Sequence, residues 1–166
     1  AILKRAYLVM QDNLKAAWAR STHTTLAGGI DLPLANPYEA LILASIIEKE
    51  TGKESDRTMV AGVFINRLRL GMLLQTDPTV IYGLGEKFDG NLRKDDLLTD
   101  QAYNTYTRPG LPPTPIAMPG LASIEAALNP AKTDALYFVA RGDGTSQFSA
   151  NLADHNRAVA KYQKRR

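Results

Sequence analysis

Two glutamates, Glu48 and Glu50, close the apolar string ASIIEKET at residues 44–51 and are the first candidates for chemistry. A carboxyl group can protonate a leaving group or take a proton from a nucleophile if its surroundings hold its pKa near the working pH. At 100° per residue, Glu50 falls within the apolar helical arc of Ile46 and Ile47, and Glu48 falls on the other side. The two carboxylates therefore point in nearly opposite directions and cannot share one proton.

Each glutamate has two interpretations. A carboxylate on an apolar face costs several kcal/mol unless it is paired or neutralised. Arg67 also falls on an apolar stripe, so an ion pair with Arg67 is the favoured explanation of Glu50, and catalysis is the alternative. Glu48 falls among small residues that could floor a cleft, where a raised pKa would permit general acid catalysis. An exposed surface glutamate is the alternative for Glu48.

Composition narrows the remaining chemistry. The 166 residues are enough for one domain that buries roughly 70% of the surface of its unfolded chain. The chain has no cysteine, and its two histidines, His23 and His155, are too far apart for a zinc site of the HExxH kind. We therefore expect no metal and no cofactor. Catalysis would have to use aspartate, glutamate, tyrosine, serine or threonine.

Charge and hydropathy say little about partners. The net charge of +3 favours anionic partners, but the excess is small and lies partly in the tail at 161–166, so we predict no nucleic-acid partner. No run approaches the roughly 18 apolar residues that a membrane span needs. We expect a single catalytic domain over residues 1–166, with 1–35 as an N-terminal linking segment and 36–166 as the core.

The candidate glutamates should lie on the best-marked helix of the chain. Asn36 is an N-cap residue, Pro37 suits the first helical position, and Glu39 completes a capping pattern, which predicts a helix from there to about Thr51. Periodic apolar residues predict an earlier helix over 2–20, followed by a loop through residues 28–29.

The later segments are less regular. Ser55 could cap a third helix that runs to Leu70 and stops at Gly71. Residues 73–121 read as a long irregular region, of the kind that usually carries function. We expect a short helix over 121–128, a β-hairpin over 135–150 and a last helix over 152–164 with His155 near its start. The predicted class is α+β, mainly helical, with a hairpin near the C-terminus and an irregular region that lines a cleft.

Five uncommon strings occur in order along the chain: ASIIEKET at 44–51, VFINRL at 63–68, LQTDPTVIYG at 74–83, YNTY at 103–106 and GLPP at 110–113. Together they resemble the YceG-like family, over a match that runs from about residue 36 to His155 and Asn156. The resemblance implies an endolytic peptidoglycan lytic transglycosylase, which cleaves the β-1,4 bond between N-acetylmuramic acid and N-acetylglucosamine in nascent strands and leaves a 1,6-anhydro end. It also assigns catalysis to Glu48.

Full-length members of this family usually carry a membrane helix and a LysM-like subdomain before the catalytic region, and we expect both to be missing here. The family location is the periplasmic face of the bacterial inner membrane, with membrane contact only through that absent anchor. The implied partners are peptidoglycan glycan strands, with peptidoglycan synthases as candidate protein partners.

Ordinary glycosidases need two carboxylates, but a lytic transglycosylase can use one as acid and then as base. The residues expected to hold the sugar have amide, aromatic or ionisable side chains. They are Gln75 and Asn104 first, then Asp77, Tyr82, Tyr103, Tyr106, Asn151 and His155.

Two of these residues, Asp77 and His155, each have a second interpretation. Asp77 could be a turn former before Pro78 or a second carboxylate across the sugar, which would make hydrolysis plausible. His155 could orient its surroundings, the favoured interpretation, or transfer a proton. At the level of the whole chain, a noncatalytic peptidoglycan-binding module is the alternative to an enzyme, and a nucleic-acid binder is a weaker third.

Overall fold

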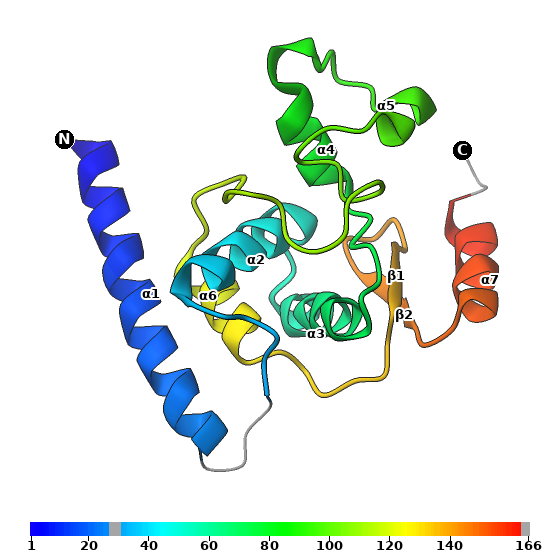
Figure 1. The fold of residues 1–166 in the computed structure, drawn as a ribbon. Helices are drawn as coiled ribbons and strands as arrows, with labels where there is room; N and C mark the ends of the chain where they lie inside the picture. Colours follow the sequence, from blue (N-terminus) through cyan, green and yellow to red (C-terminus); the bar gives the residue numbers. More distant parts are fainter. Residues whose placement is uncertain (27–30, 164–166) are drawn as a thin grey trace.

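The computed structural model describes residues 1–26 and 31–163. Within these ranges it contains seven α-helices, one 3₁₀ turn and one two-stranded sheet. Their bounds are α1 Ile2–Leu26, α2 Pro37–Glu50, α3 Glu54–Leu70, α4 Asp77–Leu84, η1 Gly85–Lys87, α5 Lys94–Leu98, α6 Leu121–Leu128, β1 Tyr137–Ala140, β2 Ser146–Ser149 and α7 Leu152–Tyr162. The helices α2, α3 and α6 lie at the centre, with α1 at one edge and α7 at the other, and α4 and α5 project together from this body (Figure 1). The α+β class predicted from sequence is confirmed.

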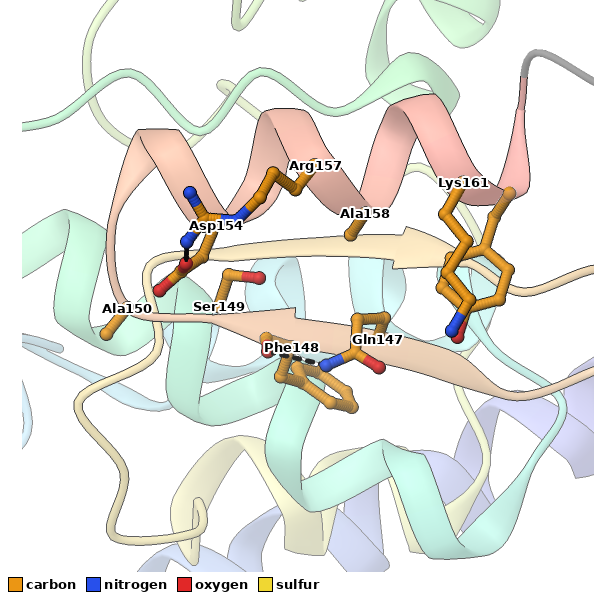
Figure 2. Close-up of a pocket in the computed structure, with 9 residues that line it drawn as sticks. Gln147, Phe148, Ser149, Ala150, Asp154, Arg157, Ala158 and Lys161 are labelled. Carbon is orange, nitrogen blue, oxygen red and sulfur yellow. Dashed lines mark hydrogen bonds and ion pairs between the residues drawn. The ribbon is translucent and has the colours of Figure 1, made fainter.

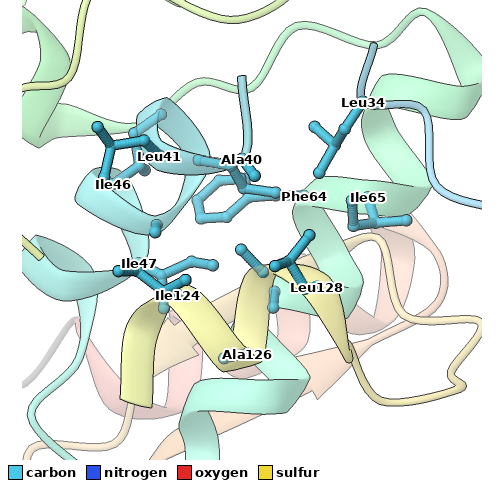
Figure 3. Close-up of a cluster of buried hydrophobic side chains, with 14 of the residues drawn as sticks. Leu34, Ala40, Leu41, Ile46, Ile47, Phe64, Ile65, Ile124, Ala126 and Leu128 are labelled. Atoms are coloured by element: carbon cyan, nitrogen blue, oxygen red, sulfur yellow. The ribbon is translucent and has the colours of Figure 1, made fainter. Parts of the chain in front are cut away.

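The core forms where α2, α3 and α6 pack together. Ile47 of α2, Phe64 of α3 and Ile124 and Leu128 of α6 are almost fully buried in one cluster (Figure 3). Burial of each such side chain contributes about 1.5–3 kcal/mol. Helix α1 adds Met10, Leu14 and Ala17 to this cluster, so it packs as part of the core.

The ends of α2 agree with the sequence signals. The Asn36 side chain accepts a hydrogen bond from the backbone N–H of Glu39 at 3.0 Å, and Pro37 occupies the first helical position. Cap signals of this kind act within a few residues, which is why they could be recognised in the sequence. Helix α2 therefore delivers Glu48 and Glu50 at its last turn, as expected.

Other helix boundaries differ from the predictions. Helix α1 continues to Leu26, beyond the predicted end at residue 20, and residues 28–29 of the predicted loop lie outside the described residues. Helix α3 begins at Glu54 with Lys53 as its N-cap, so the capping role predicted for Ser55 is wrong. Its predicted stop is confirmed: Gly71 has φ 67°, a left-handed conformation that favours glycine.

The region 73–121 is more regular than predicted. It contains α4, η1 and α5, three short elements joined by turns. Eight residues in α4 and five in α5 are too few to give a recognisable helical period. The prediction of a long, mostly irregular region therefore missed these three short elements, whereas residues 88–93 and 99–120 do lack helix and strand.

The C-terminal hairpin and helix are confirmed. Strands β1 and β2 are antiparallel, with Phe138 opposite Phe148. Helix α7 begins after Asn151 and ends at Tyr162; residue 164, the predicted end, lies outside the described residues. Among the described helices, none is both long and apolar enough to cross a membrane.

Candidate active site

A cleft of about 590 Å³ opens where the end of α2 meets α3, the start of α4, the hairpin and α7. Glu50 is one of its wall residues, and Glu48 is not. The other residues that matter for chemistry on its wall are Arg67, Gln75, Asp77, Tyr106, Tyr137, His155 and Asn156. The cleft therefore collects four of the eight predicted sugar contacts around Glu50.

Glu50 is partly buried in the cleft wall, and its carboxylate accepts a hydrogen bond from the Thr76 hydroxyl. Burial raises the pKa of Glu50 to about 7, because the charged form loses hydration. The Thr76 hydroxyl works against this rise, and the nearby charge of Asp77 adds to it. A carboxyl group with a pKa near 7 can both give and take a proton at neutral pH.

Glu48 lies on the other side of α2. Its side chain is exposed to solvent and accepts a hydrogen bond from the Ser123 hydroxyl in the first turn of α6. The predicted separation of the two glutamates onto different faces is thus confirmed. The predicted cleft floor beneath Glu48 is wrong, because Ser45 is fully buried and its hydroxyl oxygen accepts the Ile116 N–H at 3.0 Å. The segment around Ile116 covers that face.

The predicted ion pair between Glu50 and Arg67 is absent from the described part of the chain. Arg67 is 6% exposed, and its guanidinium donates from Nε to the Leu136 carbonyl at 2.6 Å and from Nη1 to the Leu73 carbonyl at 2.8 Å. The guanidinium also lies 4.9 Å from the centre of the Tyr137 ring. Backbone carbonyls and an aromatic face thus satisfy the buried charge, so Glu50 is left without a cation bonded to it.

Two segments that form one wall of the cleft are joined through Thr105. The Gln75 N–H donates to the Thr105 carbonyl at 3.1 Å, and the Thr76 N–H donates to the Thr105 hydroxyl at 3.0 Å. The Thr105 hydroxyl also lies 2.9 Å from that of Thr79. Because Thr76 is the residue that bonds Glu50, this network fixes the carboxyl relative to both segments.

Asp77 and Tyr106 form a second polar pair in the cleft. The Tyr106 hydroxyl donates to Asp77 Oδ1 at 2.5 Å. Burial raises the pKa of Tyr106, and its bond to Asp77 adds to that rise, so the hydroxyl keeps its proton at neutral pH. Asp77 is the first residue of α4, and its side chain reaches Tyr106, so it does more than form the turn that its place before Pro78 suggests.

His155 projects from the first turns of α7 into the cleft and stacks on Tyr137, with ring centres 4.9 Å apart and planes at 22°. Burial and the nearby Arg67 both lower the pKa of His155, which favours the neutral imidazole. The stack holds the ring in place against β1.

The structure places the other four predicted contacts away from the cleft. Asn104 is fully buried, and its Nδ2 donates to the carbonyls of Leu97 and Thr99 while its Oδ1 accepts the Tyr106 N–H. Its position does not support a contact with substrate; it holds the loop that presents Tyr106. Asn151 likewise acts as the N-cap of α7.

Tyr82 and Tyr103 pack against each other with ring centres 4.9 Å apart. The Tyr103 hydroxyl lies 2.8 Å from that of Thr114. Tyr82 lines a separate apolar groove of about 550 Å³ that also contains Tyr7 of α1 and Met118. Neither tyrosine lines the cleft that contains Glu50.

Sequence reasoning missed Thr76 and Tyr137. Thr76 belongs to the string LQTDPTVIYG, but nothing in that string indicates that its hydroxyl reaches α2. Tyr137 was treated only as part of a strand, although it supports both Arg67 and His155. Both roles depend on contacts between distant segments.

A smaller pocket of about 410 Å³ lies between β2 and α7 (Figure 2). It contains the ion pair of Arg157 with Asp154 and is bordered by Lys161, but none of the predicted site residues lines it. Across the residues that the structure describes, no three His, Asp or Glu side chains gather as a metal site would require. The cleft with Glu50 is therefore the candidate active site.

Comparison with known proteins identifies the family. The model of the YceG-like family matches residues 1–161. The chain belongs to the YceG-like family. A protein of Bacillus subtilis named endolytic murein transglycosylase is 50% identical to this YceG-like chain over 125 residues, and a protein of the same name from Streptococcus pneumoniae is 40% identical over 129 residues.

These matches cover 75% of this YceG-like chain in both cases, but only 34% and 23% of the two relatives. The crystal structure of a YceG-like protein from Listeria monocytogenes superposes with a TM-score of 0.67 at 49% identity, over 73% of this chain and 38% of that one. The chain thus spans about a third or less of the length of its curated relatives.

Proposed function

We propose that this chain is the catalytic part of an endolytic peptidoglycan lytic transglycosylase, with Glu50 as its general acid and base. One observation carries the assignment of the residue: Glu50 lies in the wall of the cleft with a pKa of about 7, whereas Glu48 is exposed on another face. The family membership and the names of the two relatives support the reaction class. This proposal replaces the role that the resemblance gave to Glu48.

In the proposed reaction, protonated Glu50 donates its proton to the glycosidic oxygen as the bond from that oxygen to C1 of the muramic acid breaks. The C6 hydroxyl of the same sugar then forms a bond to C1, and its proton passes to the Glu50 carboxylate. No water is consumed, and the enzyme returns to its starting protonation state. One carboxyl group suffices because the nucleophile belongs to the substrate.

The remaining cleft residues have supporting roles in this proposal. Thr76 positions Glu50 through the hydroxyl bond, and burial raises the pKa of Glu50 to about 7, so a large fraction of the carboxyl groups is protonated at neutral pH before the reaction. Gln75, Asp77, Tyr106 and His155 are the proposed sugar contacts, since all four line the cleft. The buried Asn104 and the capping Asn151 are proposed as supports for the neighbouring loop and helix.

We further propose that residues 1–166 form one catalytic domain, because α1 shares the core of α2, α3 and α6. The proposed substrate, the glycan strand of peptidoglycan, places the protein at the periplasmic face of the inner membrane. Peptidoglycan synthases are proposed as partners, since they produce the nascent strands.

The test is a digestion of uncrosslinked glycan strands by the 166-residue chain, with the fragments weighed by mass spectrometry. A lytic transglycosylase gives 1,6-anhydro ends, each one water lighter than a reducing end. Fragments with reducing ends would contradict the proposal and would indicate a hydrolase instead, with Asp77 as the candidate second carboxylate. Saturable binding of strands without any product would also contradict the proposal and would indicate a noncatalytic binding module.

A further inference from the structure

Gln75 has a backbone conformation that its residue type does not favour. Its φ is 50°, and it is the sole residue other than glycine with positive φ in the described ranges 1–26 and 31–163. A side chain with a Cβ atom is disfavoured in this left-handed region, and such residues tend to gather at functional sites. Gln75 is exposed and lies in the wall of the same cleft as Glu50.

The residues on either side force this conformation on Gln75. Leu74 and Thr76 are each 2% exposed, so the chain is anchored in the core both before and after Gln75. The N–H groups of Gln75 and Thr76 both bond to Thr105, at 3.1 Å and 3.0 Å. Because Thr76 also bonds Glu50, the backbone at Gln75 is fixed next to the residue that holds the proposed acid.

The side chain of Gln75, by contrast, has no hydrogen bond to any other described residue. Glycine would adopt this backbone without strain, so the fold alone does not account for a glutamine here. A carboxamide offers one acceptor oxygen and an NH₂ donor. An N-acetyl group offers an N–H donor and a carbonyl acceptor that point in opposite directions, so the carboxamide can bond one of them, and its NH₂ suits the acetyl carbonyl.

We infer that Gln75 is a specificity-determining residue whose carboxamide pairs with the N-acetyl group of a bound amino sugar, so that the cleft selects N-acetylated over de-N-acetylated glycan. This inference rests on the proposed function, because it takes a peptidoglycan strand as the ligand. Removal of the acetyl group leaves an ammonium group, which has no acceptor for the Gln75 NH₂ and leaves that donor unpaired. The de-N-acetylated sugar therefore binds more weakly for two reasons: it lacks the packing contact of the acetyl group, and it leaves a hydrogen bond of Gln75 unmade.

The experiment measures binding, so that turnover is not needed. The Glu50→Gln protein is titrated by calorimetry with a peptide-free tetrasaccharide of the strand and with the same tetrasaccharide after chemical de-N-acetylation. We expect the N-acetylated form to bind about 10-fold more tightly. Gln75→Gly in the same background should reduce this ratio to near one, while raising the midpoint of thermal unfolding because glycine accepts the positive φ.

Gln75→Glu supplies the sharper test. It keeps the acceptor, removes the NH₂ donor and adds a negative charge, so it should reverse the preference in favour of the ammonium sugar. Gln11→Glu, on α1 and away from the cleft wall, is the matched control for the added charge and should keep the original preference.

Equal binding of the two tetrasaccharides by the Glu50→Gln protein, or an unchanged ratio in either Gln75 variant, overturns the inference while leaving the proposed function in place. Failure of the Glu50→Gln protein to bind either tetrasaccharide would contradict the proposed function together with the inference. A fall in affinity for both sugars by the same factor in Gln75→Gly would show that Gln75 contributes contact without selecting the acetyl group, which also overturns it.

Discussion

Replacement of Glu50 by glutamine should make the protein more stable at alkaline pH and leave its stability nearly unchanged at acidic pH. The folded protein binds the Glu50 proton more tightly than the unfolded chain, since burial raises the pKa from 4.5 to about 7. Stability from this source is therefore complete below about pH 4.5 and is lost as the pH rises through 7. Glutamine mimics the protonated acid and carries no charge to lose.

The size of the effect follows from the same two values. One pKa unit corresponds to about 1.4 kcal/mol, so a rise from 4.5 to about 7 corresponds to up to about 3 kcal/mol. Water in the cleft reaches part of the Glu50 side chain and reduces the value below that limit. The Thr76 hydroxyl can still donate to the amide oxygen of the variant, so no buried donor is lost.

The assay is urea denaturation of the wild-type and variant proteins at about pH 4.5 and about pH 8.5, with the free energy of unfolding extrapolated to zero urea. Glu48→Gln is the matched control, because it makes the same chemical change two residues away on an exposed face. We expect the control to change stability by less than about 0.5 kcal/mol at both pH values. A gain for Glu50→Gln that is equal at both pH values, or is absent at pH 8.5, would refute the proposed burial of this carboxyl group.

Two further predictions concern the residues around Glu50. Asp77→Asn removes a charge that raises the pKa of Glu50, so the alkaline limb of the activity profile should move to lower pH; an unchanged limb would exclude that influence. Asn104→Ala should lower the free energy of unfolding by about 3 kcal/mol, because it removes a fully buried amide and leaves the carbonyls of Leu97 and Thr99 and the Tyr106 N–H without this partner. Retention of full stability in chemical denaturation would contradict the supporting role of Asn104.

Local signals in the sequence predicted the helix that carries both glutamates. Asn36 and Pro37 determine where α2 begins through interactions within one turn, and the periodicity correctly separated Glu48 from Glu50. Which of the two faces meets a cleft depends on distant parts of the chain: β1 packs on α3, α7 packs on the hairpin, and Ile116 of the segment 99–120 bonds Ser45 of α2. Periodicity contains no information about those contacts.

The error on Arg67 has a similar origin. Two charges on two apolar stripes suggest an ion pair, but backbone carbonyls compete for a buried guanidinium and cannot be recognised from residue types. Asn104 was misjudged in the same way, since an amide in an aromatic loop suits a sugar as well as it suits three neighbouring backbone groups. Side-chain chemistry limited the candidates, and tertiary packing decided between them.

The choice between the two glutamates is the central claim, and turnover of glycan strands by two variants tests it most directly. Wild-type protein, Glu48→Gln and Glu50→Gln are incubated with the same uncrosslinked strands, and the anhydro-ended fragments are quantified by mass spectrometry. We predict fragments from the wild type and from Glu48→Gln and none from Glu50→Gln. An inactive Glu48→Gln beside an active Glu50→Gln would contradict the account.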